Sequence, residues 1–565
     1  MDRRQTEVMS ILPSVLRSDP LRRVVRGAAL TAAVAVTIAP AIVAQSTRAA
    51  IPIAPVVREQ TADQQIMQAL NRLAFGPRPG DVASVRAIGV DAWIDRQLHP
   101  ERIDDTEMNE LLARYPLMQQ DQNALAAQFA QIQRRSRVAR RDTAMQEGAQ
   151  SAGLDDLKQA RRGRTQLLGE IESARVARAV ASDRQLLEVM TDFWENHFNV
   201  FAGKNPVEPY YLADYDRVIR AHALGKFREL LGAVAHSPAM LVYLDNARSR
   251  ANPRQNTRGA KQDALNENYG RELMELHTLG VDGGYTQEDV IEAARALTGW
   301  TVRPPAQGGG FIFRPQWHDT GEKVFLGHRL AAGRGEQDGE DVLDILARSP
   351  ATAHFIAHKL AQRLVSDSPS TALVEAAART YIRTDGDIRE VVRTIVTSPA
   401  FFSSHAYHTK VKSPFEVVVS AARALGAAPD TTARTARAVA QLGQPVFGHR
   451  DPNGWPESGD SWMNTGAILN RINFGLAVAA NRLPGATLSS WPGADALSAA
   501  PRAAQVDAVV SSILGGAISP DTRKILMSGE HPLAADAARQ AGAPQLTGLA
   551  QVVGLALGSP EFQRR

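Results

Sequence analysis

Apolar residues recur at intervals of three and four along most of the chain, which is the spacing of one face of an α-helix. Long segments with this period cover residues 101 to 180 and 341 to 402, and strands do not alternate with helices as they do in a parallel α/β fold. The pattern predicts a mainly α protein built as a large multi-helix domain. One clear apolar stripe consists of Leu265, Tyr269, Leu273 and Leu276.

A short alternating pattern departs from the helical period. Apolar and other residues alternate around residues 311 to 313 and again around 324 to 326. This pattern predicts a small β-hairpin near residues 311–327, whose turn would contain His318, Asp319 and Lys323.

A polar stripe runs beside the apolar stripe that begins at residue 265. Asn268, Glu272 and Glu275 lie about 90° from it on the same helix, so an amide and two carboxylates share the edge of a buried face. His277 lies on the far side of the apolar stripe, so an unbroken helix cannot bring it to one metal ion with Glu275. Asp289 fits a capping box at the start of the next helix, and capping is therefore its expected role.

The segment from residue 182 to 201 predicts a second chemically interesting helix. Its apolar stripe contains Met190, Trp194, His197 and Phe201. His197 is thus expected among aromatic side chains, where a buried and hydrogen-bonded core histidine is the simplest interpretation. The other face carries four polar residues that we expect to be mostly exposed, namely Glu188, Asp192, Glu195 and Asn199.

Composition excludes several classes of protein. With 565 residues, 44% hydrophobic, the chain is long enough for a large buried core. The net charge is +4, but arginines are spread widely and aromatic residues are only 6%, so nucleic-acid binding is not expected. The absence of cysteine excludes disulfides, thiolate nucleophiles and iron–sulfur clusters, and leaves any metal site to His, Asp, Glu and Asn.

The N-terminus has the pattern of an export signal. Arg22, Arg23 and Arg26 precede the apolar run GAALTAAVAVTIAPAIVA, so we interpret residues 1–44 as a signal that directs the protein to the periplasm, the cell surface or the medium. The paired arginines fit the twin-arginine route loosely, because Leu21 stands where Ser or Thr is usual. The alternative is an uncleaved membrane anchor, although the run is short for a membrane span.

Six segments together resemble the bacterial family called domain of unknown function 1800, and they extend over most of the chain after residue 44. The resemblance implies an exported bacterial protein, and it implies a partner of the exported family called domain of unknown function 1501, whose genes often lie beside those of this family and which is related to alkaline phosphatases and sulfatases. It implies no reaction and no catalytic residue. The segments are NRLAFGPRPGD at 71–81, FWENHF at 193–198, NENYGRELMELHTLGVDGGYTQEDVIEAARALTGW at 266–300, HDTGEKVFLG at 318–327, KSPFE at 412–416 and NGWPESGDSWMNTGAILNR at 453–471.

With the resemblance, the sequence predicts five parts. After the signal come an N-terminal helical part of the family domain at 45–100, a polar helical insertion at 101–180, the family core at 181–480 and a C-terminal alanine-rich helical part at 481–565.

The first functional hypothesis is a hydrolase that acts on an extracellular or periplasmic polymer or ester. Paired carboxylates suit acid–base catalysis, because burial and mutual repulsion hold one protonated while its neighbour stays charged. The same residue types can hold a divalent metal ion that activates water. Glu272 and Glu275 are three apart on one helix, which suits a shared metal or hydrogen bond better than the opposed pair of a glycosidase. The predicted catalytic residues are Glu272, Glu275, His197, His318, Asp319 and Lys323; Asn268, Trp194 and Trp300 would bind substrate; and Glu272, Glu275 and His318 would bind the metal.

Two other hypotheses remain open. A non-enzymatic helical protein that binds or assembles with a neighbouring secreted enzyme would use Arg271 and the glutamates as an internal ion-pair network. This hypothesis explains the HDTGEK segment poorly, because a turn does not require His, Asp and Lys together. The third hypothesis is a cofactor enzyme in which His197 ligates a haem.

Overall fold

Hydroxyl side chains mark the starts of several helices, as the rules for helix capping predict. Thr61, Thr286 and Ser413 each form a capping box with the residue three positions later, which satisfies two N–H groups at the helix start. The expected capping role of Asp289 is confirmed, because its carboxylate accepts a hydrogen bond from the backbone N–H of Thr286 at 2.8 Å.

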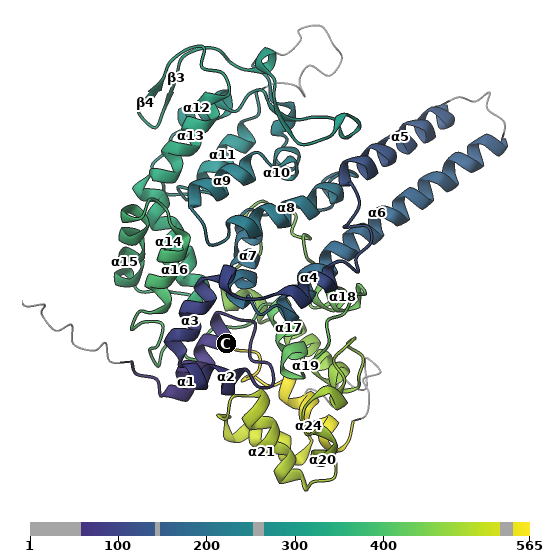
Figure 1. Cartoon of the computed structure of the whole chain (residues 1–565), viewed down its shortest axis with the longest axis vertical. Coiled ribbons are helices and arrows are strands. Elements are labelled where there is room, and N and C mark those ends of the chain that lie inside the picture. The colour runs from purple at the N-terminus through teal and green to yellow at the C-terminus, as the bar shows by residue number, and fades with distance from the viewer. Residues whose placement is uncertain (1–57, 142–146, 252–264, 532–545) are drawn as a thin grey trace, which may run out of the picture. The chain divides into compact units, whose positions relative to one another are not determined.

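The computed structural model describes residues 58–141, 147–251, 265–531 and 546–565. Val56–Arg565 is one compact unit, and the expected export signal at 1–44 lies outside the described residues. Among the described helices, none is both long enough and apolar enough to cross a membrane. The prediction of a mainly helical protein is confirmed (Figure 1).

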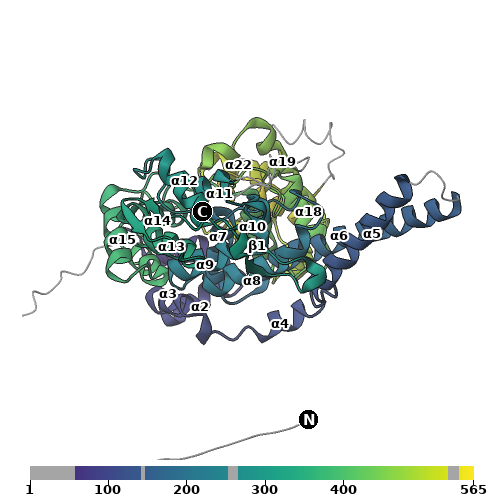
Figure 2. The same cartoon turned by 90° about the horizontal axis from the view of Figure 1, so that it is seen from above.

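The first helices lead into a long helical hairpin. They are α1 (Ala62–Arg72), α2 (Asp81–Ile88), α3 (Val90–Leu98), α4 (Thr106–Leu112), α5 (Gln122–Arg141) and α6 (Glu147–Ala181). The last two pack along each other and extend together beyond the neighbouring helices in both views (Figures 1 and 2).

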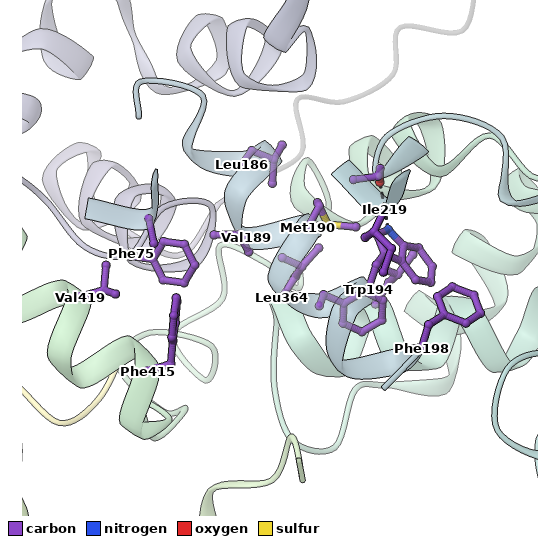
Figure 3. Packing of buried hydrophobic residues seen from close by; sticks show 14 of the residues in the cluster. Phe75, Leu186, Val189, Met190, Trp194, Phe198, Ile219, Leu364, Phe415 and Val419 are labelled. Carbon is purple, nitrogen blue, oxygen red and sulfur yellow. Dashed lines mark hydrogen bonds between the residues drawn. The ribbon is translucent and has the colours of Figure 1, made fainter. Parts of the chain in front are cut away.

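The centre of the core is built around α7 (Gln185–His197). Figure 3 shows its apolar side chains packed against residues from distant segments. The following helices are α8 (Pro209–His222), α9 (Phe227–Ala235), α10 (Pro238–Tyr243), α11 (Glu267–Glu275) and α12 (Gln287–Ala296). The labelled core residues in Figure 3 are Phe75, Leu186, Val189, Met190, Trp194, Phe198, Ile219, Leu364, Phe415 and Val419.

The expectation that the polar face of α7 is mostly exposed is wrong. Glu188, Glu195 and Asn199 are 2%, 7% and 5% exposed, and the side chain of Asp192 is 16% exposed. This face is buried because helices cover α7 on more than one side, and arginines from those helices neutralise its carboxylates. Arg220 of α8, for example, forms a buried ion pair with Glu188.

The β structure is small, as predicted, but its strands pair differently from the expected hairpin. β1 (Trp300–Val302) pairs with β2 (Phe311–Phe313), and β3 (Lys323–Phe325) pairs with β4 (His328–Leu330), both antiparallel. The expected pairing of residues 311 to 313 with 324 to 326 is therefore wrong. A partner for each strand lies nearer in the chain, so both pairs close shorter loops.

Helices complete the rest of the chain. They are α13 (Gln337–Arg348), α14 (Pro350–Leu364), α15 (Thr371–Arg383), α16 (Ile388–Val396), α17 (Pro414–Ala424), α18 (Arg434–Gln441), α19 (Thr465–Ala479), α20 (Ala494–Ser498), α21 (Arg502–Ile513), α22 (Pro520–Ser528) and α24 (Gly548–Leu557).

Replacement of glycine by alanine should have opposite effects on stability at two positions. A Cβ on Gly475 of α19 would lie 2.7 Å from the backbone oxygen of Gly554 in α24, whereas a Cβ on Gly163 of α6 would meet no atom within 4 Å. Gly475→Ala should lower the free energy of unfolding by about 1–3 kcal/mol through overpacking. Gly163→Ala should raise it by about 0.5–1 kcal/mol, because alanine favours the helix. Urea unfolding of both variants measures the two values, and a loss of stability in Gly163→Ala that equals the loss in Gly475→Ala would contradict the packing account.

Candidate functional site

Three segments far apart in the sequence meet in one cleft with a volume of about 60 Å³. They are the FWENHF segment in α7, the KSPFE segment at the start of α17, and the loop NGWPESGDSW, which ends in the short helix η6 (Gly459–Trp462). The charged lining consists of Arg175, Asp192, Glu195, Arg363, Glu416, Glu457 and Arg565, and the aromatic lining of Phe415, Phe447, Trp455 and Trp462.

A side-chain clamp fixes the loop against α7. The amide of Asn196 donates to the backbone oxygen of Trp455 at 2.8 Å and accepts from its N–H at 2.7 Å. Gly454 has a φ of +71°, and a Cβ there would lie 2.2 Å from the backbone oxygen of Asn196. Only glycine permits this approach, so the loop holds Trp455 and Glu457 at fixed positions in the cleft.

Guanidiniums and carboxylates alternate through the wall of the cleft. Arg175 of α6 contacts both Asp192, at 3.1 Å, and Glu195. The lining has four carboxyl groups and three guanidiniums, so charge balance favours one protonated carboxyl group. The remaining pairs are Arg363 with Asp192 (2.7 Å), with Glu416 (3.2 Å) and with Glu457 (3.3 Å), and Arg565 with Glu416 (3.1 Å).

Glu195 in the wall of the cleft and Asp216 behind it have pKa values that are shifted in opposite directions. Burial raises the pKa of Glu195 well above its usual range against the attraction of Arg175, and Asp216 raises it further. Burial also acts to raise the pKa of Asp216, but Arg220 and Arg178 outweigh it and hold that pKa well below its usual range. Of the two groups, Glu195 therefore holds a proton more readily, and Asp216 holds its negative charge more readily.

Apart from Glu195, Glu457 is the carboxyl group of the cleft with the fewest guanidinium contacts. Its carboxylate has one guanidinium contact, to Arg363 at 3.3 Å, whereas Asp192 and Glu416 each contact two guanidiniums. Its side chain is 11% exposed. A carboxyl group with a raised pKa and a carboxylate with one guanidinium contact thus line the same cleft on different segments.

The predicted catalytic glutamates lie in α11 beside tyrosines and outside the cleft lining. Glu275 accepts a hydrogen bond from the hydroxyl of Tyr285 at 3.1 Å. Burial and the charge of Glu275 raise the pKa of Glu272, while Arg271 opposes this. Glu272 and Glu275 of the predicted polar stripe therefore lie close enough to interact electrostatically. Their catalytic role stays a prediction. Asn268 is exposed on the same helix.

The HDTGEK segment forms a buried ion-pair lock in this structure. Lys323 donates to the carboxylate of Asp338 at 2.7 Å, and the Nε2 atom of His318 lies 3.2 Å from the same carboxylate oxygen. The side chains of Lys323 and Asp338 are 0% exposed. Asp319 forms a two-bond pair with Arg295, at 2.9 and 3.1 Å. These contacts give His, Asp and Lys of this segment a structural role, which the sequence did not suggest.

The predicted metal ligands do not form one group. Across the described residues, no three His, Asp or Glu side chains have an arrangement that could hold a metal ion. Glu272 and Glu275 are on α11, whereas His318 contacts Asp338 and the backbone oxygen of Thr298. The proposed set of Glu272, Glu275 and His318 is therefore not assembled here.

The predicted aromatic and histidine site residues are core residues. Trp194 is fully buried, and its N–H donates to the backbone oxygen of Ala223 at 3.0 Å. His197 is buried among rings, and its Nε2 lies 3.1 Å from the backbone oxygen of His277. Trp300 is buried and stacks on His236. No ring of these tryptophans lines the cleft, so their proposed contact with substrate has no support from this geometry.

Acid should destabilise the protein through His277. Burial lowers the pKa of His277 to about 3 from a usual value of 6.5, and Lys359 adds to the effect. The neutral ring therefore stabilises the fold fully above pH 6.5, and this contribution is lost as the pH falls towards 3. We expect a loss on the order of 3 kcal/mol between pH 7 and pH 4 from this residue.

Urea unfolding at both pH values tests this effect of acid. The variant His277→Phe keeps a ring and cannot take up a proton, so its loss between pH 7 and pH 4 should be clearly smaller. The matched control is His354→Phe, at a histidine whose side chain is 53% exposed, which should leave the loss unchanged. Equal losses in the original protein and in His277→Phe would refute the prediction.

Comparisons with known proteins agree with the sequence resemblance. A family model described as "Protein of unknown function (DUF1800)" matches residues 68–564. No curated protein and no solved structure matches the chain. The comparisons therefore give a family without a reaction, and the chemistry must be argued from the cleft itself.

Proposed function

The chain belongs to the DUF1800 family of proteins of unknown function, and we propose that it is a hydrolase that works by acid–base catalysis in the cleft described above. The observation that carries the proposal is that the cleft wall holds Glu195, whose pKa is raised, on a different segment from Glu457, which has one guanidinium contact. A carboxylic acid that stays protonated near neutral pH is suited to protonate a leaving group.

The roles follow from the pKa shifts of Glu195 and Asp216 and from the contacts of Glu457. Glu195 donates its proton to the leaving oxygen as the bond to that oxygen breaks. Glu457 takes a proton from the attacking water, because it is the least engaged carboxylate of the cleft. Asp216 does not line the cleft and is a positioning residue that keeps the proton on Glu195. The substrate class is an ester or a glycosidic bond of an extracellular or periplasmic polymer.

This placement differs from the site based on Glu272 and Glu275. Those two residues are close on one helix, whereas Glu195 is in α7 and Glu457 is in the loop before η6. A pair on separate segments can flank a bond from two sides, which acid–base hydrolysis requires. The pair on α11 stays an alternative position for the reaction. The activity of variants in which each pair is substituted distinguishes the two positions.

A panel of chromogenic esters and glycosides, together with polysaccharides assayed for released reducing ends, tests the proposal. We expect one class to be hydrolysed with a bell-shaped dependence of kcat/KM on pH, in which the alkaline limb reports Glu195. No hydrolysis of any class over the tested range would count against the proposal.

A second candidate function is a non-enzymatic binding or assembly partner of an exported enzyme, such as a member of domain of unknown function 1501. One observation favours it: each guanidinium of the cleft is already paired with a carboxylate, as in a structural ion-pair network. In that case replacement of Glu195 would leave partner binding intact and no activity would be found.

Export is part of the proposal and rests on the basic and apolar N-terminal pattern alone. Fractionation of cells that express the full chain should recover it outside the cytoplasm, at a mass reduced by removal of residues 1–44. Recovery of full-length chain from the cytoplasm would contradict this part.

A further inference from the structure

Two tryptophans form an aromatic surface in the cleft that the proposed roles of Glu195 and Glu457 do not use. The ring centroids of Trp455 and Trp462 lie 5.9 Å apart, at an interplanar angle of 44°. Both residues line the cleft and both are partly exposed to solvent, so their rings lie where the cleft opens. Because indole surface in contact with water costs free energy, a ligand that covers these rings gains apolar contact.

Hydrogen bonds hold the aromatic surface in place. The amide of Asn199 donates to two backbone oxygens just before this loop, at 3.1 and 2.8 Å, and thus adds to the clamp between Asn196 and Trp455. The indole N–H of Trp462 donates to the backbone oxygen of Pro456 at 3.1 Å. The two rings are therefore positioned before a ligand binds, and little conformational entropy is lost on binding.

Polar atoms without a protein partner lie in the same cleft lining. Among the described residues, the indole N–H of Trp455, the Oε1 atom of Glu457 and the side-chain NH2 group of Gln444 form no hydrogen bond. None of these three atoms is fully buried. The first and the third are donors, and the second is an acceptor. A ligand that satisfies them must have donors and acceptors beside an apolar face.

A pyranose ring has this combination of surfaces. Its C–H groups form an apolar face that can pack on an aromatic ring, and its hydroxyl groups both donate and accept hydrogen bonds. We propose that Trp455 and Trp462 bind a pyranose unit of a neutral polysaccharide, so that the bond hydrolysed in the cleft is glycosidic. The choice of a glycosidic bond rests on the proposed function, whereas binding of the sugar does not.

The small volume of the cleft determines how the sugar lies. About 60 Å³ has room for a few water molecules and not for a whole sugar. The pyranose ring therefore lies on the partly exposed indoles, and only its glycosidic oxygen and the attacking water enter between Glu195 and Glu457. As the bond from C1 to the leaving oxygen breaks, the water oxygen bonds to C1. The proton of Glu195 goes to the leaving oxygen, and one proton of the water goes to Glu457.

The polar contacts of the cleft favour a neutral sugar over other ligands that pack on aromatic rings. Each guanidinium of the lining already contacts a carboxylate, so a uronate or a sulfated sugar would meet no unpaired guanidinium there. Proline-rich peptides also bind to aromatic surfaces. Proline has no N–H, however, so such a peptide would cover the Oε1 atom of Glu457 without donating to it.

Isothermal titration calorimetry of the full chain with hexasaccharides tests the proposal. The neutral probes are hexamers of glucose in α- and β-linked form, of N-acetylglucosamine, of mannose and of xylose. The other probes are a galacturonate hexamer and a proline-rich peptide. We expect at least one neutral hexamer to bind with a Kd of about 1 mM or tighter, and the other probes at least about tenfold more weakly. No binding of any neutral hexamer, or tighter binding of another probe, would overturn the proposal.

Three tryptophan variants locate the binding site. Trp462→Ala should weaken binding of the neutral hexamer at least about tenfold, because it removes one of the two rings. Trp455→Phe keeps a ring and removes the N–H, so it should weaken binding by about three- to tenfold. The matched control is Trp317→Ala, at a partly exposed tryptophan that does not line the cleft, which should leave binding unchanged. Thermal unfolding verifies that each variant is folded, and unchanged binding in folded Trp462→Ala and Trp455→Phe would overturn the proposal.

The release of reducing ends from the bound hexamer distinguishes this inference from the proposed function. A hexamer that binds through Trp462 and is not hydrolysed would support the sugar site and count against the hydrolase. Hydrolysis of an ester in the cleft without binding of any hexamer would support the hydrolase and overturn the sugar site.

Discussion

Glu195→Gln is expected to lower kcat/KM of the hydrolytic reaction by about 10²–10⁴-fold, the usual contribution of a general acid. Glutamine has the shape of a protonated carboxyl and can still donate to Asp216, but it cannot transfer a proton. Because the pKa of Glu195 is raised well above its usual range, a neutral replacement should change stability less here than at a carboxylate that stays charged. Steady-state kinetics and thermal unfolding of the same preparation measure both effects.

Asp192→Asn is the matched control for this result. Asp192 has charged partners, Arg175 and Arg363, so its replacement removes one carboxylate from each of these two buried guanidiniums and should destabilise the fold clearly. A large loss of activity with unchanged stability should thus occur at Glu195 and not at Asp192. Full activity of the Glu195→Gln variant would exclude Glu195 as the general acid.

Asp216→Asn should shift the alkaline limb of the pH profile to lower pH. The charge of Asp216 raises the pKa of Glu195, so its removal lowers that pKa and the acid loses its proton at a lower pH. A purely structural role of Asp216 would lower stability without moving this limb.

Asp338→Ala is expected to lower the free energy of unfolding by about 3–5 kcal/mol, because it leaves a buried cation without its partner. Lys323 and Asp338 are 0% exposed and 2.7 Å apart, and His318 contacts the same carboxylate. Chemical unfolding at pH 7 measures the effect. The double variant Lys323→Met with Asp338→Ala should recover part of the loss, because no charge is then left buried.

Glu322→Gln is the control on the surface of the same segment. Glu322 pairs with Arg329, and both side chains are largely exposed, so its removal should not change stability measurably. If Asp338→Ala were as stable as Glu322→Gln, the lock in the HDTGEK segment would be refuted, and a catalytic role for His318 and Lys323 would regain support.

Elements with a strong local signal could be predicted from the sequence. The helical period gave the mainly α fold, and the capping box gave the role of Asp289. The apolar stripe through Met190, Trp194 and His197 is buried as expected. These features depend on residues a few positions apart, so a single sequence contains them.

The cleft could not be predicted, because it depends on contacts between distant segments. Glu195 and Asp192 have the polar pattern of an exposed helix face, and only the arginines of α6 and α14 make their burial favourable. The one usable signal was that polar and aromatic residues gather in the KSPFE segment at the start of a helix and in the loop NGWPESGDSW. The structural contacts of the HDTGEK segment could not be predicted for the same reason, since Asp338, the partner of His318 and Lys323, lies in the next helix.

The most direct test of the central claim is kcat/KM of Glu195→Gln and Glu272→Gln measured side by side on one hydrolysed substrate at neutral pH. A general acid in the cleft predicts a loss of about 10²-fold or more for Glu195→Gln and a change of no more than about threefold for Glu272→Gln. The reverse order, with activity lost at Glu272 and kept at Glu195, would contradict the account and move the reaction to α11.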